Sequence, residues 1–301
     1  MSCFMDEWTV DGKIRQDQFG ELLQIHRDTE VGHEVSCLRM LQFPESEEEY
    51  EAAKMTVLDE SELRTYFYEM VDRTKVECQV MDLLKENGNV IRYEECDVVE
   101  NEDRFGWTVY IRIELLKPLL SYVKEHPLST EDVVRLGIDI SHALEGCRQY
   151  EIIHRNVCPE TIFVTDDGRF KLGGFDIAHE REKVRSDHKQ EKPGNYMSPE
   201  QYGGKNYSYA SDMYSLGLIM YRFLNRDRLP FLPPSPEPVR YFDREEAKKK
   251  LLDGRPLPDP VDASPKLAEI VKKACAYRPE NRYGSAAEMR QALVCLQKEG
   301  V

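Results

Sequence analysis

The stretch that decides the fold is Ile153–Phe163, which reads IHRNVCPETIF. Its polar turn passes into an apolar run, and an Asp-Asp-Gly turn separates that run from a second one ending in KLGG. Two short apolar runs joined by such a turn are typical of a β-hairpin. We therefore predict a strand at Thr161–Thr165 that pairs with a second strand at Phe170–Gly173.

Helical patterns lie on both sides of this hairpin. In Ser129–Tyr150 apolar residues recur every three or four positions, and Ser129 with Asp132 resembles a capping arrangement at the helix start. The segment Tyr209–Asn225 is apolar enough to form a buried helix. Further helices are predicted at Arg244–Leu252, Pro265–Ala276 and Ala286–Lys298.

The first third of the chain reads mainly as strands. Arg27–Gly32 is predicted to join two of these strands as a hairpin turn. One long helix is predicted at Ser61–Leu84, where apolar residues recur at roughly helical spacing. The predicted strands are Phe19–His26, Glu34–Gln42, Val90–Cys96 and Trp107–Leu115. Strands followed by helices favour an α+β protein of two lobes, with a boundary near Leu115–Leu119.

Composition and charge exclude several classes of protein. The chain has 301 residues, 41% of them apolar, and a formal net charge of −15. Such an acidic chain argues against binding to nucleic acid or to an anionic membrane surface. The start, MSCFMDEWTV, lacks the features of a secretory signal. No stretch approaches the roughly 18 apolar residues of a membrane span, so we expect a cytoplasmic protein.

The eight cysteines stand at positions 3, 37, 78, 96, 147, 158, 275 and 295. No two have CxxC spacing, and no histidine completes a zinc-binding pattern. In a chain of this size they read as reduced thiols, and a buried structural role is expected for each.

Further motifs follow IHRNVCPETIF in a fixed order: KLGGFDIA, YMSPEQY, SDMYSLGLIMY and RPENRY. This set resembles the C-lobe of a protein kinase and is most similar to the bacterial Ser/Thr (Hanks-type) family. The resemblance covers about Trp8–Leu296. It implies a two-lobed α+β fold, with a small mainly-β N-lobe at residues 1–116 that carries one main helix. A larger mainly-α C-lobe would occupy residues 117–301.

The resemblance assigns architectural roles to several matched residues. Glu200 of SPE is expected to pair with Arg282 of RPENRY. Asp212, at the start of the buried helix, is expected to hold the backbone of the HRN turn. These residues support the fold and not an activity.

The residues expected to perform chemistry depart from the kinase pattern. Asn156 stands where kinases carry the aspartate of HRD, and an amide cannot accept a proton as a base. The loss of such positioned acid–base help costs on the order of 10² to 10⁴ in rate. Thr161 replaces the metal-binding asparagine and is shorter. Cys158 replaces a lysine.

The DFG motif, whose aspartate binds magnesium in kinases, reads Gly174-Phe175-Asp176 here. The carboxylate is thus moved by two residues, roughly 6–7 Å along an extended chain. Magnesium requires oxygen ligands at about 2.0–2.1 Å. Asp176 is either a turn residue that tolerates unusual backbone angles or a metal ligand at a shifted position, and we favour the first.

The nucleotide-binding loop is also changed. An alignment of Ile14–Leu22 to the glycine-rich loop retains only Gly20, although such glycines let backbone N–H groups approach phosphates. Arg39 falls where the phosphate-binding lysine belongs. We expect it to pair with Glu77, with Glu69 as the other candidate. The exchange of lysine for arginine is not conservative at a tight site.

The resemblance also outlines a vestigial nucleotide cleft. Adenine would lie between Leu22 and Cys37 on one side and Phe163 on the other. Ile113 would lie at the back of the cleft, with the hinge at Glu114–Leu116. No cofactor or metal is expected, and any binding of ATP should be weak and independent of metal.

These departures favour a catalytically inactive kinase-like protein, a pseudokinase that acts as a protein-binding, scaffolding or regulatory module. Its partner would be another protein, such as an active kinase or the substrate of one. The alternative is an ATP-dependent Ser/Thr kinase, or another nucleotide-dependent transferase, with a rewired and weakly active site that uses Asp176 and Thr161.

Overall fold

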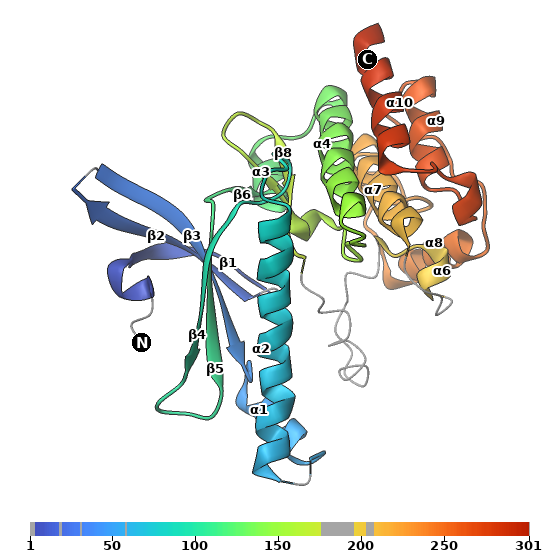
Figure 1. Cartoon of the computed structure of the whole chain (residues 1–301). Helices are drawn as coiled ribbons and strands as arrows, with labels where there is room; N and C mark the ends of the chain where they lie inside the picture. The colour runs from blue at the N-terminus through green and yellow to red at the C-terminus, as the bar shows by residue number, and fades with distance from the viewer. Residues whose placement is uncertain are drawn as a thin grey trace. The chain divides into compact units, whose positions relative to one another are not determined.

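The computed structural model describes residues 4–17, 20–30, 32–57, 59–175, 196–202 and 208–300. These residues divide into two compact units (Figure 1). The first contains the described residues up to Glu86, Ile91–Leu116, and Gly174 with Phe175. The second contains Asn87–Val90, Lys117–Gly173 and the described residues from 196 onward. Within the described ranges, no helix is both long enough and apolar enough to span a bilayer.

An antiparallel sheet of five strands, in the order β1-β2-β3-β5-β4, forms the centre of the first unit. Its strands are β1 (Thr9–Asp17), β2 (Gly20–Thr29), β3 (Gly32–Phe43), β4 (Tyr93–Glu100) and β5 (Trp107–Ile113). On the central strand β3, Arg39 lies opposite Leu22 of β2 and Ile111 of β5. Since side chains alternate between the faces of a sheet, these three share one face.

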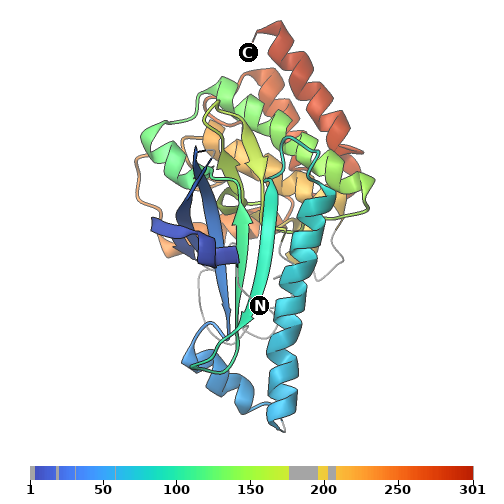
Figure 2. The same cartoon turned by 60° about the vertical axis from the view of Figure 1, so that its left-hand side comes forward.

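Two helices belong to this unit, α1 (Glu47–Lys54) and the long α2 (Glu60–Leu83). The Asp59 side chain caps α2 by accepting a hydrogen bond from the backbone N–H of Glu62 at 2.9 Å. Figure 2 shows α2 running beside the strands. The face of α2 with Leu63, Phe67 and Met81 is buried, so apolar burial fixes which side of the helix meets the sheet.

The other face of the sheet is covered by the N-terminal turn η1 (Phe4–Glu7) and Trp8. The Trp8 indole packs on Ile25 and Leu38. The guanidinium carbons of Arg27 and Arg112 lie 4.8 and 4.9 Å from the centre of the Trp8 ring. A cation over an aromatic face is attracted by its quadrupole, so two arginines hold Trp8 in place.

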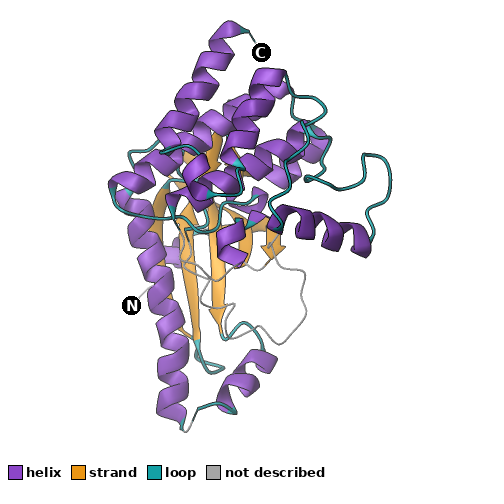
Figure 3. Ribbon diagram, turned by 90° about the vertical axis from the view of Figure 1, so that its right-hand side faces the viewer, coloured by secondary structure: helices purple, strands orange, loops and turns teal. Residues whose placement is uncertain are grey.

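The second unit is mainly helical (Figure 3). It contains a small sheet of β6 (Lys117–Pro118), β7 (Ile162–Val164) and β8 (Phe170–Leu172), and the turns η2 (Pro159–Thr161) and η5 (Pro279–Asn281). Its helices are α3 (Leu119–Glu125), α4 (Thr130–Gln149), α6 (Pro199–Tyr202), α7 (Tyr209–Leu224), α8 (Tyr241–Leu252), α9 (Pro265–Ala274) and α10 (Ala286–Glu299).

Helix α4 is central to this unit because it packs against both α7 and α10. A Cβ at Gly137 would lie 2.7 Å from Leu293 and 2.8 Å from Met220. A larger residue would therefore have to displace the ends of these two side chains. The Ser129–Asp132 capping box at the start of α4 is present as expected.

The small mainly-β unit and the larger mainly-α unit agree with the expected α+β architecture, but three local predictions were wrong. Strand β1 was not predicted, because it is an edge strand with mostly exposed side chains and no apolar alternation. The predicted turn Arg27–Gly32 is too long, since Thr29 still pairs with Gly32. Strand β4 begins at Tyr93 because Val90 bridges to Leu172 in the second unit.

The expected burial of every cysteine is also wrong for two of the described ones. Cys295 is exposed and Cys96 is half-buried, whereas Cys37, Cys147 and Cys158 are buried. The described cysteines are all free thiols.

Candidate active site

The HRN turn is held by Asp212 of α7, as expected. The Asp212 carboxylate accepts hydrogen bonds from the backbone N–H groups of His154 at 2.9 Å and Arg155 at 2.8 Å. Arg155 has a φ of 67°, which costs energy in a residue with a side chain. Burial raises the pKa of Asp212 to about 7, although the two N–H bonds favour the charged form.

His154 is a neutral, structural member of the same turn. Burial lowers the pKa of its imidazole to about 4, which outweighs the effect of the Gly173 carbonyl. The ring Nε2 lies 3.0 Å from that carbonyl oxygen, so Nε2 carries the proton. The backbone N–H of Asn156 donates to Nδ1 at 3.3 Å. The imidazole thus ties the HRN turn to the residue that precedes Gly174.

Asn156 lies at the end of this turn and is half-buried. Its side-chain oxygen accepts a weak hydrogen bond from the Cys158 thiol at 3.7 Å. An amide offers an oxygen that can orient a hydroxyl but has no proton-accepting charge. The position therefore favours binding and alignment over base catalysis.

The Thr161 hydroxyl closes the loop that begins at Asn156. It donates to the backbone carbonyls of Asn156 and Cys158, each at 3.0 Å, and accepts from the Cys158 N–H at 3.2 Å. Thr161 is only 2% exposed. Since its oxygen is already used by the backbone, Thr161 does not fit the role of metal ligand that the rewired alternative gave it.

The displaced DFG carboxylate is only partly observable. Gly174 has a φ of 70°, a conformation that suits glycine, and it brings no side-chain oxygen. Asp176 lies outside the described residues. No group of three or more His, Cys, Asp or Glu that could hold a metal occurs in the described part of the chain. Asn156, Thr161 and Gly174 thus do not make the oxygen ligand set that magnesium requires.

A buried ion pair joins β3 to α2 in the first unit. Arg39 Nη1 lies 2.6 Å from Glu77 Oε1, and their side chains are only 9% and 1% exposed. The expected Arg39–Glu77 pair is therefore confirmed. The other candidate, Glu69, lies on the exposed side of α2. A buried pair of this kind fixes orientation more reliably than it adds net stability.

The cleft residues of the first unit lie on the same face of the sheet as Arg39. Cys37 lies opposite Ile113, and both are buried, as is Leu22. The Ser36 hydroxyl donates to the Ile113 carbonyl at 2.8 Å. Burial raises the pKa of the Cys37 thiol to about 12, so this cysteine is an apolar wall residue and not a nucleophile.

The predicted hinge and the other cleft residues are also located. The Glu114 carboxylate accepts the Arg92 N–H at 2.6 Å, and Leu116 is half-buried at the end of the first unit. Phe163 is buried on β7 of the second unit.

A Cβ at Gly20 would lie 2.7 Å from the Met40 carbonyl oxygen. Close packing of β2 on β3 therefore explains this glycine without a phosphate.

The expected ion pair between Glu200 and Arg282 in the second unit is confirmed as well. Arg282 Nη1 and Nη2 donate to the two carboxylate oxygens of Glu200, each at 2.7 Å. The first unit also brings near each other two thiols that the sequence did not single out, those of Cys78 and Cys96. No local pattern signals this proximity, because only the packing of α2 on β4 brings the two residues together.

Comparisons with known proteins identify the class of fold and site. The family model for the protein kinase domain matches residues 39–294. This match covers most of the chain, so the chain belongs to the protein kinase family and has its two-lobed α+β fold.

Several relatives of the chain are named as bacterial serine/threonine-protein kinases. The chain is 33% identical over 179 residues to the serine/threonine-protein kinase PknB of Mycolicibacterium smegmatis, covering 56% of this chain and 27% of that protein. It is 29% identical over 235 residues to the probable serine/threonine-protein kinase CPE1738 of Clostridium perfringens, covering 77% and 33%. A third relative, the probable serine/threonine-protein kinase CE0033 of Corynebacterium efficiens, is 32% identical over 214 residues, covering 66% and 31%. The chain thus spans a third or less of each relative.

These findings correct one prediction. The expectation that the chain is not an enzyme is wrong, because a protein kinase domain and relatives named as serine/threonine-protein kinases point to a kinase enzyme. Asn156, Thr161 and Gly174 replace residues of a kinase site. These replacements by themselves do not show that the chain lacks enzyme activity.

Proposed function

We propose that the chain is an ATP-dependent protein kinase that phosphorylates serine or threonine side chains through a rewired, slow active site. The observation that carries the proposal is the buried Arg39–Glu77 pair, at 2.6 Å, in a chain that matches the protein kinase domain. In protein kinases a lysine on this strand, paired with a glutamate on this helix, must be in place for phosphoryl transfer. We propose that Arg39 supplies the cation in its place.

The replacement of the base sets the expected rate. Kinases with a complete site turn over at about 1–100 per second. Loss of positioned acid–base help costs about 10² to 10⁴. A turnover between about 10⁻⁴ and 1 per second follows for Asn156 in place of aspartate, which is measurable with a labelled phosphate.

We propose that ATP binds weakly and that this binding step does not require a metal. The Thr161 hydroxyl supports this proposal, because it is already bonded to the backbone. The sequence leaves Asp176 as the carboxylate whose role in phosphate transfer should be tested. We propose that the protein partner is the substrate that receives the phosphate, and that the reaction takes place in the cytoplasm. No contact with nucleic acid or with a membrane is part of the proposal.

Transfer of a labelled γ-phosphate from ATP, with magnesium present, tests the function. The acceptors are the chain itself and a basic protein rich in serine and threonine, which suits the net charge of −15. Intact mass should rise by about 80 Da for each phosphate gained. A parallel thermal-shift titration with ATP, with and without magnesium, reports binding separately from transfer.

Two variants make the result interpretable. Arg39→Met removes the cation that pairs with Glu77 and should abolish transfer. Arg64→Met removes a surface cation, 51% exposed and paired with Glu100, and should leave transfer unchanged. Absence of label with the unaltered chain overturns the proposal. Label that persists in Arg39→Met also overturns it, because that phosphate would come from a contaminating kinase.

A further inference from the structure

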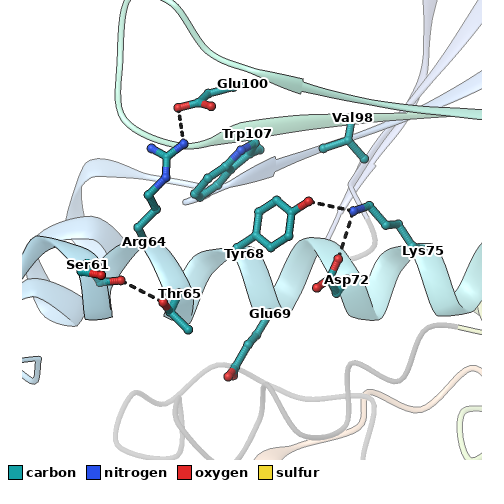
Figure 4. Close-up of a pocket in the computed structure, with 10 residues that line it drawn as sticks. All are labelled: Ser61, Arg64, Thr65, Tyr68, Glu69, Asp72, Lys75, Val98, Glu100 and Trp107. Atoms are coloured by element: carbon teal, nitrogen blue, oxygen red, sulfur yellow. Dashed lines mark hydrogen bonds and ion pairs between the residues drawn. The ribbon is translucent and has the colours of Figure 1, made fainter.

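A groove between α2 and β4 of the first unit brings together two thiols that the kinase function does not use. The groove has a volume of about 820 Å³ and is lined by residues of both elements, including Lys75, Cys78, Tyr93 and Cys96. A second groove of about 740 Å³ continues along α2, and both are lined by Lys75 and Val98 (Figure 4).

The two thiols face the same groove from neighbouring elements. Cys78 lies on the buried side of α2 and is 5% exposed, whereas Cys96 on β4 is half-buried and lines the open groove. The pKa of each thiol responds to the presence of the other. Cys96 is thus reachable from the open groove, and Cys78 lines the same groove from α2.

The surroundings make Cys96 the more acidic of the two. The hydrogen bond from Cys78 lowers its pKa, with a further contribution from Lys75, against the opposing effects of burial and of Asp97 and Glu77. The pKa of Cys78 is raised, first by the same hydrogen bond and then by burial. Figure 4 shows the Lys75 ammonium held by Tyr68 Oη and Asp72 Oδ1, each at 3.0 Å. Thiolates are the reactive form of cysteine.

Other described cysteines provide a contrast. Burial raises the pKa of Cys37, Cys147 and Cys158 to about 12 each. Buried thiols of this kind are poor first targets for an oxidant. The same holds for Cys78, so Cys96 is the thiol that reacts first. The α2–β4 groove therefore differs from these sites in both access and acidity.

We propose that Cys96 and Cys78 form a reversible disulfide when the protein meets hydrogen peroxide, and that this bond locks α2 to β4. The Cys96 thiolate attacks one peroxide oxygen, the O–O bond breaks, and with one proton the leaving oxygen becomes water. The Cys78 thiol then attacks the resulting sulfenic sulfur and releases a second water as the S–S bond forms. Two thiols lose two electrons in total, which reduce the peroxide. A dithiol reverses the change.

A disulfide between Cys78 and Cys96 would hold Glu77 in its present position. Cys78 follows Glu77 directly on α2, and the thiols meet while Arg39 and Glu77 are paired at 2.6 Å. A covalent link between α2 and β4 therefore holds the helix in the paired arrangement. This inference goes beyond the proposed kinase function, and formation of the bond is measured without any assay of phosphate transfer.

The test is peroxide treatment of the folded chain, followed by intact mass and peptide mapping under non-reducing conditions. A mass loss of about 2 Da is expected, with a Cys78–Cys96 cross-linked peptide that a dithiol removes. Cys96→Ser and Cys96→Ala should abolish the cross-link. Cys295→Ser removes an exposed thiol elsewhere and should keep it.

Each other outcome overturns the proposal. Cross-linking that persists in both Cys96 variants places the disulfide elsewhere. Cys96 that ends as a sulfinic acid without a link to Cys78 shows that the second thiol does not resolve the first. Hydrogen exchange of the α2 amides near Glu77 should slow in the oxidised chain, and unchanged exchange refutes the locking of the helix.

Discussion

Replacement of Glu200 by glutamine tests the ion pair that stabilises the second unit. The Arg282 side chain is fully buried and Glu200 is 9% exposed. All five N–H groups of the guanidinium are used, since Arg282 also donates to the carbonyls of Ala210, Ala276 and Tyr277. Glu200→Gln keeps the shape but leaves this buried cation without its anion.

The expected loss of stability is about 3–4 kcal/mol. Loss of one partner of a buried pair typically costs about 3–5 kcal/mol. A second route gives a similar value. Burial by itself raises the pKa of Glu200, but hydrogen bonds from Arg282 and the backbone outweigh burial and lower it from 4.5 to about 2. At about 1.4 kcal/mol per pKa unit, this difference corresponds to about 3 kcal/mol.

The same pKa predicts a dependence on pH. The folded pKa of Glu200 lies below its unfolded value, so its contribution is fully present above about pH 4.5. The contribution is lost as the pH falls toward 2. The difference in unfolding free energy between the unaltered chain and Glu200→Gln should therefore shrink across this range.

Urea unfolding of both chains at a series of pH values measures this difference. Glu145→Gln is a matched control, because Glu145 forms a pair of similar geometry with Arg290, and these side chains are 18% and 34% exposed. This half-buried pair should contribute less than the buried one, toward the value of about 0–1 kcal/mol for pairs at the surface. A loss below about 1 kcal/mol for Glu200→Gln at neutral pH, or a difference that does not change with pH, would refute the reasoning.

Three further predictions concern single residues. Asn156→Asp should raise the rate of γ-phosphate transfer by about 10² to 10⁴, and an unchanged initial rate would show that this position does not limit transfer. Arg39→Met should destabilise the first unit by about 3–5 kcal/mol, since Glu77 loses a buried cation; chemical denaturation measures it, and a loss under about 1 kcal/mol contradicts the assignment. Gly217→Ala should cost about 1–3 kcal/mol because its Cβ would lie 2.6 Å from Cys275 Sγ. An unchanged Tm would show that the neighbouring helices can separate there.

Helices with one apolar face were the most predictable part of the fold. The predicted helix Ser61–Leu84 corresponds to α2 at Glu60–Leu83, and the one predicted at Ser129–Tyr150 corresponds to α4 at Thr130–Gln149. Periodic burial and a capping side chain are both local properties, so a sequence displays them directly. Strand β1 could not be found this way, since an edge strand buries few side chains.

The sequence predicted the ion pairs of the candidate site but not its hydrogen bonds. Motif order assigned Arg282 to Glu200 because matched residues keep their neighbours in a shared fold. The occupied hydroxyl of Thr161 was not predictable, since its bonds depend on the closure of the loop from Asn156. The Cys78–Cys96 contact depends on helix packing, which neither residue's neighbours in the sequence reveal.

The tryptophan held between two arginines affects how the protein can be shortened. The family match begins at residue 39, in the middle of β3. A version trimmed to that boundary would lose β1, β2, the first part of β3 and the Trp8 cluster that packs against Tyr110. The newly bared apolar surface and unpaired strand edge would favour self-association. Recombinant versions should therefore keep the residues before position 39, Trp8 included.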